Sequence, residues 1–200
     1  MRSGDRVAAE RILDGWDGRG LDAAALDDLV VPVILRLDGL WAEGGASLSE
    51  VYLATRLCAA IVDDRRPAGL DSLRPDQPRI AICMVDDSHA LGMKMVLQVM
   101  RCAGYAVEDW GTRRTVDQVI DRVIHEGVEV LLLSVLMLRS ALRVAQVRER
   151  LRQVGWNPII VVGGAPFRLD RGLAGEVGAD FVGMSASDVL PIMARIEALR

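Results

Sequence analysis

Apolar residues in the first third of the chain recur every three or four positions, and this stretch contains no strand-like segment. Such spacing predicts an all-helical unit. We expect helices near residues 6–16 and 22–41, and a third helix that begins near Ser47. Glu50 follows Ser47 at the spacing of a capping box, in which the two residues satisfy backbone N–H groups of each other. The N-terminal part is therefore predicted to be a helical bundle.

A charged, proline-containing stretch separates this helical part from the rest of the chain. Residues 63–78, "DDRRPAGLDSLRPDQP", hold three of the seven prolines. Proline clustered with polar residues between two periodic segments is typical of a linker. We therefore expect a helical cap domain over residues 1–72 and a second domain over residues 73–200.

Beyond the linker, short apolar runs alternate with helical segments. The expected strands cover residues 79–85, 105–110, 128–135, 157–164 and 179–184. The expected helices lie near residues 91–103, 115–126, 140–154, 168–177 and 187–199. This alternation predicts an α/β fold with a five-stranded parallel sheet covered by helices on both faces. We expect the Rossmann-like (flavodoxin-like) strand order 2-1-3-4-5, in which a ligand binds outside the carboxyl ends of the strands.

The composition is that of a soluble globular protein, with 51% hydrophobic and 26% charged residues. The net charge of -4 provides no basic footprint, so we expect no direct nucleic-acid binding. No apolar run approaches the about 20 residues that span a bilayer, and the polar start does not resemble a signal peptide. We expect a cytoplasmic protein without a membrane partner. Cys58, Cys83 and Cys102 lie far apart and form no CxxC pair, which favours buried free thiols.

Polar residues gather where the expected strands end. Asp86, Asp87, Ser88 and His89 follow the first strand, Ser134, Arg139 and Ser140 follow the third, and Gly163 and Gly164 end the fourth. The carboxyl ends of parallel strands share one edge of a sheet, so these residues are expected on one rim. A metal-bound histidine gains basicity when its other ring nitrogen donates to a carboxylate. Paired glycines allow a bulky ligand to approach the backbone closely.

Structural roles remain open for the same residues. Asp87 or Ser88 can cap the following helix, His89 can be a hydrogen-bonded polar residue at a turn, and Gly163-Gly164 can be an ordinary turn. Elsewhere, the sequence favours structural roles: His125 at a helix C-terminus, core packing for three methionines, and surface solvation for Arg139. The methionines are Met93, Met95 and Met100.

Three spaced motifs together resemble the cobalamin-binding domain of methionine synthase, methyltransferase corrinoid proteins and light-sensing B12 regulators. The motifs are Asp87-x-His89-x-x-Gly92, then Ser134-x-Leu136 about forty residues later, then Gly163-Gly164. The segment at residues 33–55 is similar to the helical cap that precedes the domain in these families. The resemblance therefore extends through nearly the whole chain.

This resemblance implies a bound cobalamin whose cobalt takes His89 as its lower axial ligand, the base-off/His-on arrangement. Asp87 would hydrogen-bond the other imidazole nitrogen, and Ser140 would end the relay. The upper face would lie under the cap, where Trp41 is either a contact of the upper ligand or a core aromatic. The implied cofactor-binding residues are Trp41, Asp87, Ser88, His89, Leu91, Gly92, Gly104, Ser134, Leu136, Ser140, Gly163 and Gly164.

The implied function is that of a corrinoid carrier without a complete catalytic cycle of its own. It would shuttle methyl groups between a substrate-specific methyltransferase and a second, acceptor methyltransferase, with a reductive activator as a possible further partner. The segments "SVLMLRSA" and "GGAP" favour the carriers. However, Asp86 replaces the glycine that carriers usually have, and "HALG" is closer to the regulators. The alternatives are a sensor module that binds adenosyl- or methylcobalamin without methyl turnover, and a cobalamin storage protein.

Overall fold

The computed structural model describes residues 74–200 and, before them, residues 32, 33, 36, 40, 43–47, 49, 50, 53 and 54. Of the expected cap helices, the structure describes residues 32, 33, 36 and 40 of the second and residues 49, 50, 53 and 54 of the third, all of them helical. The rest of these helices, Trp41 and the boundary at residue 72 lie outside the described residues. The capping box is confirmed: the Ser47 amide donates to Glu50 Oε2 over 2.8 Å, and the Glu50 amide donates to Ser47 Oγ over 3.3 Å.

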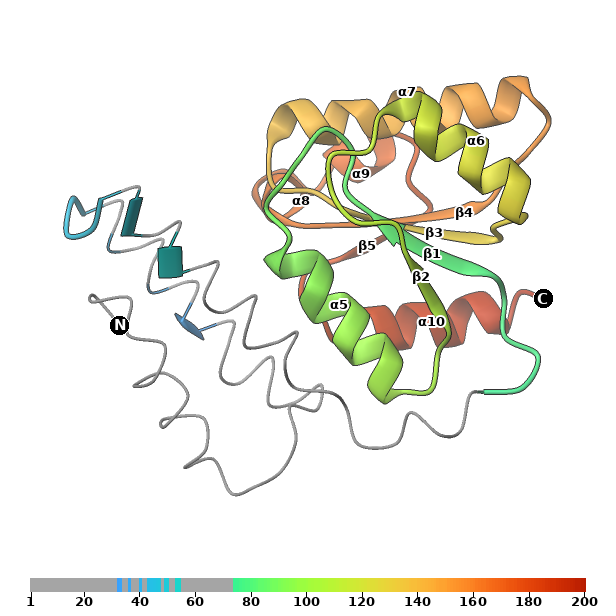
Figure 1. Ribbon diagram of the computed structural model, residues 1–200, viewed down its shortest axis with the longest axis horizontal. Coiled ribbons are helices and arrows are strands. Elements are labelled where there is room, and N and C mark those ends of the chain that lie inside the picture. Colours follow the sequence, from blue (N-terminus) through green and yellow to red (C-terminus); the bar gives the residue numbers. More distant parts are fainter. Residues whose placement is uncertain are drawn as a thin grey trace.

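Five parallel strands form one sheet with the order β2-β1-β3-β4-β5 (Figure 1). The strands are β1 (Ile80–Cys83), β2 (Val107–Asp109), β3 (Val130–Ser134), β4 (Ile159–Gly163) and β5 (Phe181–Gly183). All four neighbouring pairs are parallel, so every strand ends at the same edge. The predicted α/β fold and strand order are confirmed.

Helices cover both faces of this sheet (Figure 1). The helices are α5 (Leu91–Cys102), α6 (Val116–Glu126), α7 (Leu138–Gln153), α8 (Ala165–Leu169), α9 (Leu173–Glu176) and α10 (Val189–Glu197). One face packs against α5 and α10, and the other against α6, α7, α8 and α9. Successive strands therefore have helices on both sides, which is the arrangement that right-handed crossovers between parallel strands produce.

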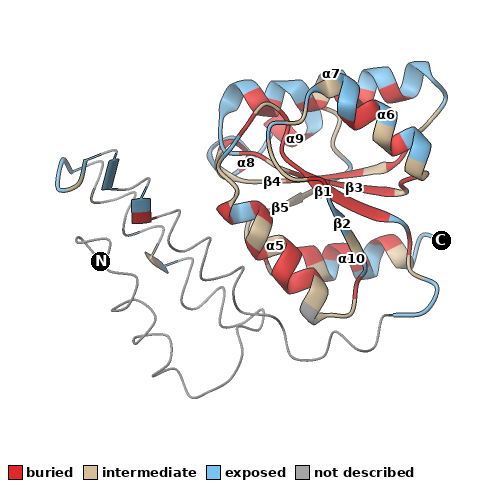
Figure 2. Ribbon diagram, in the orientation of Figure 1, coloured by how far each residue is buried: buried red, intermediate tan, exposed pale blue. Residues whose placement is uncertain are grey.

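Alternating side chains of the strands enter two separate cores. In Figure 2, buried residues are coloured along the central strands and on the helices at both faces of the sheet. In β1, Ile80 and Ile82 face α5 and α10, whereas Ala81 and Cys83 face α6 and α7. Side chains of a strand point to opposite faces with a period of two residues, and here both faces are covered by helices. The expected core role of the methionines is confirmed, since Met93, Met95 and Met100 are at most 5% exposed.

The prediction of a single helix over residues 168–177 is wrong. The structure has two short helices there, α8 with Pro166 in its first turn and α9 after Gly172. Asp170 has an extended backbone, with φ -127°, and its carboxylate accepts from the Gly172 amide over 2.8 Å. This local bond favours a turn over a continuous helix. Helix α7 also begins two residues before the expected start at residue 140.

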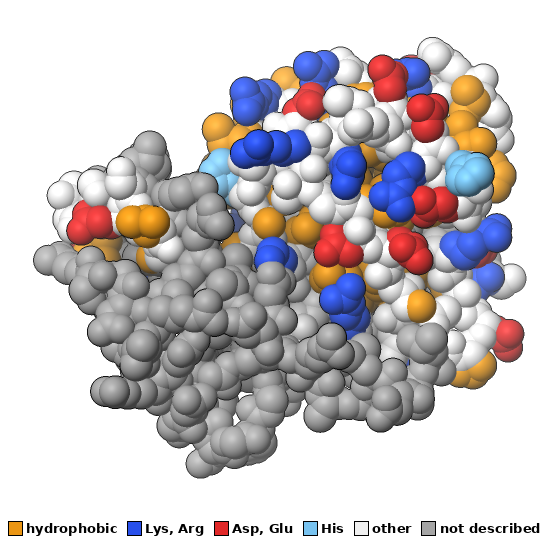
Figure 3. All heavy atoms as spheres, viewed as in Figure 1, with side chains coloured by type: hydrophobic (Ala, Val, Ile, Leu, Met, Phe, Trp, Pro, Cys, Tyr) orange, Lys and Arg blue, Asp and Glu red, His pale blue; other side chains and the backbone are white. Residues whose placement is uncertain are grey.

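The surface over α6 and α7 carries charges of both signs, which intermingle on the face seen in Figure 3. Several of these charges form ion pairs, among them Arg122 with Glu126 within α6, and Arg150 of α7 with Asp117 of α6. Within the part of the chain that the structure describes, no helix is both long and apolar enough to cross a membrane.

Candidate functional site

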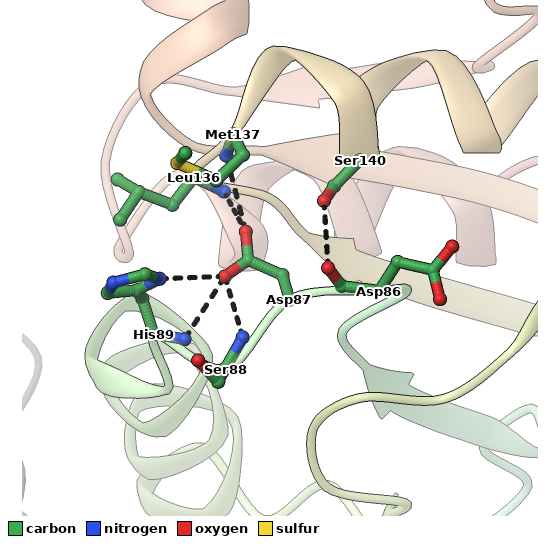
Figure 4. Close-up of polar contacts among 7 residues, drawn as sticks. All are labelled: Asp86, Asp87, Ser88, His89, Leu136, Met137 and Ser140. Atoms are coloured by element: carbon green, nitrogen blue, oxygen red, sulfur yellow. Dashed lines mark hydrogen bonds and ion pairs between the residues drawn. The ribbon is translucent and has the colours of Figure 1, made fainter.

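The carboxylate of Asp87 joins two loops at the carboxyl edge of the sheet (Figure 4). Its Oδ1 accepts from the backbone amides of Ser88 and His89 over 2.7 and 3.1 Å. Its Oδ2 accepts from the amides of Leu136 and Met137, at the start of α7, over 3.1 and 3.2 Å. The side chain is 1% exposed. The loop after β1 is thereby held against the loop after β3.

These hydrogen bonds keep the buried carboxyl group ionised. Burial alone would raise the pKa of Asp87, but hydrogen bonds from the His89 side chain and from the amides of His89, Leu136 and Met137 outweigh it and lower the pKa. An ionised carboxylate has only acceptor atoms. The ring nitrogen of His89 that contacts it must therefore be a donor.

The ring of His89 contacts Asp87 through one nitrogen and leaves the other facing away from the carboxylate (Figure 4). Nδ1 lies 2.9 Å from Asp87 Oδ1, and the histidine side chain is 37% exposed. Because Nδ1 carries the proton, Nε2 of the neutral ring has a free lone pair. No partner for Nε2 lies among the described residues. The carboxylate thus fixes both the tautomer and the direction of an accessible nitrogen donor.

The glycines expected to line a ligand slot are held in close contact with neighbouring loops. Gly164 has a φ of 124°, and a Cβ there would lie 1.7 Å from the carbonyl oxygen of Val135. A Cβ on Gly163 would lie 3.2 Å from the Gly183 carbonyl oxygen, and one on Gly92 would lie 3.3 Å from Ser134 Oγ. Glycine at these positions allows the ends of β3, β4 and β5 and the start of α5 to approach one another closely at the carboxyl edge.

Two of the residues implied by the resemblance lie elsewhere than expected. Ser140 is buried, but its hydroxyl donates to the backbone carbonyl of Asp86 over 3.4 Å, not to the Asp87 carboxylate. The relay is therefore not continuous in this structure. Gly104 follows Ala103, the C-cap of α5, and precedes β2, so it lies at the amino edge of the sheet, opposite His89. Its φ of 81° is the left-handed conformation that favours glycine directly after a helix C-cap.

The remaining site residues lie on the expected rim. Ser88 and Leu136 are exposed, Leu91 is buried in the first turn of α5, and Ser134 ends β3. The expectation that Asp87 or Ser88 caps α5 is wrong, because the N-cap is Ala90 and makes no side-chain cap. Asp87 satisfies loop amides instead.

Three other expectations from the sequence can be compared with the structure. His125 lies in the last turn of α6, and Arg139 is exposed. Cys83 is a buried free thiol, and burial raises its pKa to about 12. Cys58 lies outside the described residues, as does the side chain of Cys102. The described thiol is thus unreactive core, as expected.

Asp86 was placed at this edge from the sequence, but its backbone conformation was not foreseen, and Ser185 and Ser187 were not found by sequence reasoning. Asp86 has a φ of 50°, a conformation that glycine, asparagine and aspartate tolerate best, and this explains why glycine is compatible with the position. Ser185 and Ser187 follow β5 with hydroxyl oxygens 3.1 Å apart. Gly183 pairs with Gly163, so these hydroxyls share the rim with the glycine pair. Their place after the fifth strand was the available signal.

A family model described as the B12 binding domain matches residues 79–193. The chain belongs to the B12-binding domain family. The trimethylamine corrinoid protein of Methanosarcina barkeri is 30% identical over 106 residues, which cover 52% of this chain and 48% of the relative. Trimethylamine corrinoid protein 1 of Methanosarcina mazei is 26% identical over 136 residues, which cover 62% of each. The chain thus spans about half to three fifths of the length of these relatives.

Solved structures of B12-binding proteins share the fold. The monomethylamine corrinoid protein of Methanosarcina barkeri matches with a TM-score of 0.78 and 17% identity, over 98% of this chain and 92% of that chain. A cobalamin-binding protein from Desulfitobacterium hafniense matches with a TM-score of 0.56 and 21% identity, over 98% and 94%. The methanol:cobalamin methyltransferase complex of Methanosarcina barkeri matches with a TM-score of 0.55 and 21% identity, over 98% of this chain and 76% of that chain. The membership expected from the three sequence motifs is confirmed.

Proposed function

We propose that this B12-binding protein is a corrinoid carrier that binds cobalamin base-off with His89 as the lower axial ligand, and passes methyl groups between two methyltransferases. The observation that carries the proposal is the Asp87–His89 pair, in which a buried carboxylate holds Nδ1 and leaves Nε2 accessible. Cobalamin, when bound, supplies a cobalt centre that can accept and release a methyl group.

The donor set fits such a cofactor. A corrin ring brings the equatorial ligands of its own cobalt, so that the protein needs to add one axial donor. The hydrogen bond from Nδ1 to an ionised carboxylate raises the basicity of Nε2 and keeps the ring in one orientation. Asp87 is itself held by four backbone amides, so the imidazole is anchored to both loops.

The polar groups beside the glycine pair also fit a cofactor with a long substituent. Gly163 and Gly164 present backbone without side chains at the edge shared by β4 and β5, where the Ser185 and Ser187 hydroxyls lie nearby. We assign to this edge, with Ser134 and Leu136, the displaced nucleotide tail. Hydroxyl and backbone groups suit its ribose and phosphate.

Methyltransferase partners are proposed from the relatives. The curated relatives are named trimethylamine corrinoid proteins, and one solved relative is part of a methanol:cobalamin methyltransferase complex. Just before α7 and along its first turns, four apolar side chains are 41% to 61% exposed: Leu136, Met137, Leu138 and Leu142. An exposed apolar rim of this kind suits contact with a corrin edge or with a docking partner.

The visible spectrum of the full chain reconstituted with methylcobalamin tests the axial ligand. We expect a spectrum that indicates an axial nitrogen ligand in the wild type, and its loss in His89→Ala. The matched control is His125→Ala, since His125 is the other of the two histidines and lies in the last turn of α6. Failure of the wild type to retain methylcobalamin, or an unchanged spectrum in His89→Ala, would contradict the proposal.

A second assay separates the carrier from a sensor. Incubation with a methyl donor, a corrinoid methyltransferase and a thiol acceptor should yield methylated acceptor in a cobalamin-dependent manner. A light- or ligand-dependent change in oligomeric state, measured by light scattering and without methyl turnover, would favour the sensor instead.

A further inference from the structure

Asp86 has an unusual backbone conformation, and its amide, carbonyl and carboxylate each contact another segment of the chain. Its φ of 50° lies in the left-handed region. Its amide donates to the Arg114 carbonyl over 3.0 Å, and its carbonyl accepts from Ser140 Oγ over 3.4 Å. Its carboxylate pairs with Arg143 Nε over 3.1 Å. Asp86 therefore connects the loop after β1 to the loop before α6 and to the first turns of α7.

These contacts act on the residue that holds the histidine. Asp87 follows directly, and its carbonyl accepts from the Arg113 amide over 2.8 Å. Its carboxylate accepts from two amides of its own loop and two of the loop after β3. A left-handed residue reverses the direction of the chain locally. The turn at Asp86 thus sets the direction in which the Asp87 side chain leaves the loop, and with it the place of His89.

We infer that Asp86 and Arg143 are positioning residues for His89, forming a lock that holds the loop after β1 in the geometry needed for axial ligation. This inference rests on the proposed function and deepens it, because it assigns a role to residues that do not touch the cofactor. Ser140 belongs to the same lock, since its buried hydroxyl secures the Asp86 carbonyl.

The exposure of the ion pair indicates a local role. The side chains of Arg143 and Asp86 are 46% and 39% exposed. Pairs with this exposure add little to global stability, because water and salt screen them. The Arg143 guanidinium also donates to Gln146 on its own helix over 2.9 Å, which restricts the side chain from the other side. The pair is thus suited to hold a loop whose backbone conformation is rarely adopted.

Hydrogen exchange of the cofactor-free full chain tests the lock directly. We expect Arg143→Met and Asp86→Asn to accelerate exchange at the amides of residues 87–90 roughly twofold to fivefold, the range expected for one exposed ion pair. Asparagine still tolerates the left-handed conformation, so the second variant removes only the charge. The matched control is Arg150→Met, because Arg150 lies on the same helix, is 47% exposed and pairs with Asp117 away from this loop.

Methylcobalamin binding tests what the lock positions. Arg143→Met and Asp86→Asn should each raise the dissociation constant roughly twofold to fivefold and lower the fraction with the nitrogen-ligated spectrum, whereas Arg150→Met should change neither. Arg143→Lys keeps the charge and should recover part of the loss. In a His89→Ala background, Arg143→Met should not change the dissociation constant for methylcobalamin any further, because the lock affects binding through the histidine.

The outcomes distinguish this inference from the proposed function. Unchanged loop exchange in both lock variants overturns the inference. Faster loop exchange with unchanged methylcobalamin affinity and spectrum overturns the positioning role. A wild-type chain that retains no methylcobalamin overturns the proposed function and the positioning of a cobalt ligand together, while the exchange measurement still reports whether Asp86 and Arg143 hold the loop.

Discussion

At the scale of single residues, the site depends on one buried carboxylate. The Asp87 side chain is 1% exposed, and its carboxylate accepts hydrogen bonds from four backbone amides and from a ring nitrogen of His89. A buried charge is tolerated when hydrogen bonds replace the water that it loses. Each of these donors would be left unsatisfied if the carboxylate were removed, so Asp87 contributes to the stability of the fold as well as to the orientation of His89.

We predict that Asp87→Asn lowers the free energy of unfolding by about 2 kcal/mol at neutral pH, because an amide nitrogen then faces backbone donors. The pKa of Asp87 is lowered in the folded state, so its stabilising contribution is complete above the ordinary aspartate pKa of 3.8 and is lost as the pH falls through the folded value. The difference between wild type and variant should therefore narrow below about pH 4. Urea unfolding of both proteins at several pH values measures this difference in unfolding free energy.

The control for this prediction is Asp121→Asn, which changes an exposed carboxylate on α6. It should alter the unfolding free energy by less than about 0.5 kcal/mol. A loss for Asp87→Asn as small as that of the control would contradict the structural role of the carboxylate.

Gly164 supports a second residue-scale prediction. Gly164→Ala should destabilise the protein by about 3 kcal/mol or more, because the new methyl group would lie 1.7 Å from the Val135 carbonyl oxygen at a φ of 124°. Gly175→Ala, in α9, is the matched control, since a Cβ there has no atom within 4 Å. Thermal unfolding of both variants measures the difference, and equal melting temperatures would refute it.

At the scale of elements, α7 organises the site. Its N-cap residue, Met137, donates its amide to the Asp87 carboxylate in the loop after β1. Its first turns supply the Ser140 hydroxyl and the Arg143 guanidinium to the same loop. Farther along the helix, the buried Arg148 donates to the carbonyls of Gly178 and Pro158 and pairs with Asp180. One helix thus connects the loop bearing His89 to the opposite end of β4 and β5. A shift of α7 would move both.

The capping box of α6 allows an element-scale prediction. Thr115 Oγ1 accepts from the Gln118 amide over 3.2 Å, and the Gln118 side chain accepts from the Thr115 amide over 3.1 Å. Thr115→Ala should lower the free energy of unfolding by about 1 kcal/mol, since one amide of the first turn loses its partner. Thr112→Ala, three residues earlier in the same loop, should have a much smaller effect. Urea unfolding compares the two, and similar losses would contradict the prediction.

At the scale of the whole molecule, an apolar core packs on each face of the sheet, and loops form its carboxyl edge. This rigid support under irregular loops is the common position of ligand sites in parallel α/β folds. A ligand that binds only the folded protein stabilises it in proportion to its affinity and concentration.

We therefore predict that methylcobalamin at a free concentration of one hundred times its dissociation constant raises the unfolding free energy by about 2.7 kcal/mol. His89→Ala should show a smaller rise at the same cobalamin concentration, because the axial bond is lost. Thermal unfolding in the dark, with and without the cofactor, measures the effect. An equal rise in wild type and variant would mean that His89 adds no affinity.

The site was predicted in part from sequence. The order of Asp87, His89 and Gly92 after an apolar run placed them at a strand end, and the strand order placed Ser134 and Gly164 on the same edge. The Ser140 bond to the Asp86 carbonyl was not foreseen, because sequence spacing does not determine which oxygen a buried hydroxyl reaches. Gly104 was assigned to the slot from the family resemblance, although its position before β2 puts it at the other edge.

What the sequence by itself determined is the part governed by local periodicity: the five strands, the alternation with helices, the core methionines and the glycine pair. These follow from side-chain spacing and backbone freedom, which act between near neighbours. Only the tertiary structure decided that Asp87 accepts the amides of Leu136 and Met137, about fifty residues away, and that Asp86 meets Arg143. Such contacts depend on the relative placement of packed elements, because hydrogen bonds and ion pairs require distances that spacing along the chain does not define.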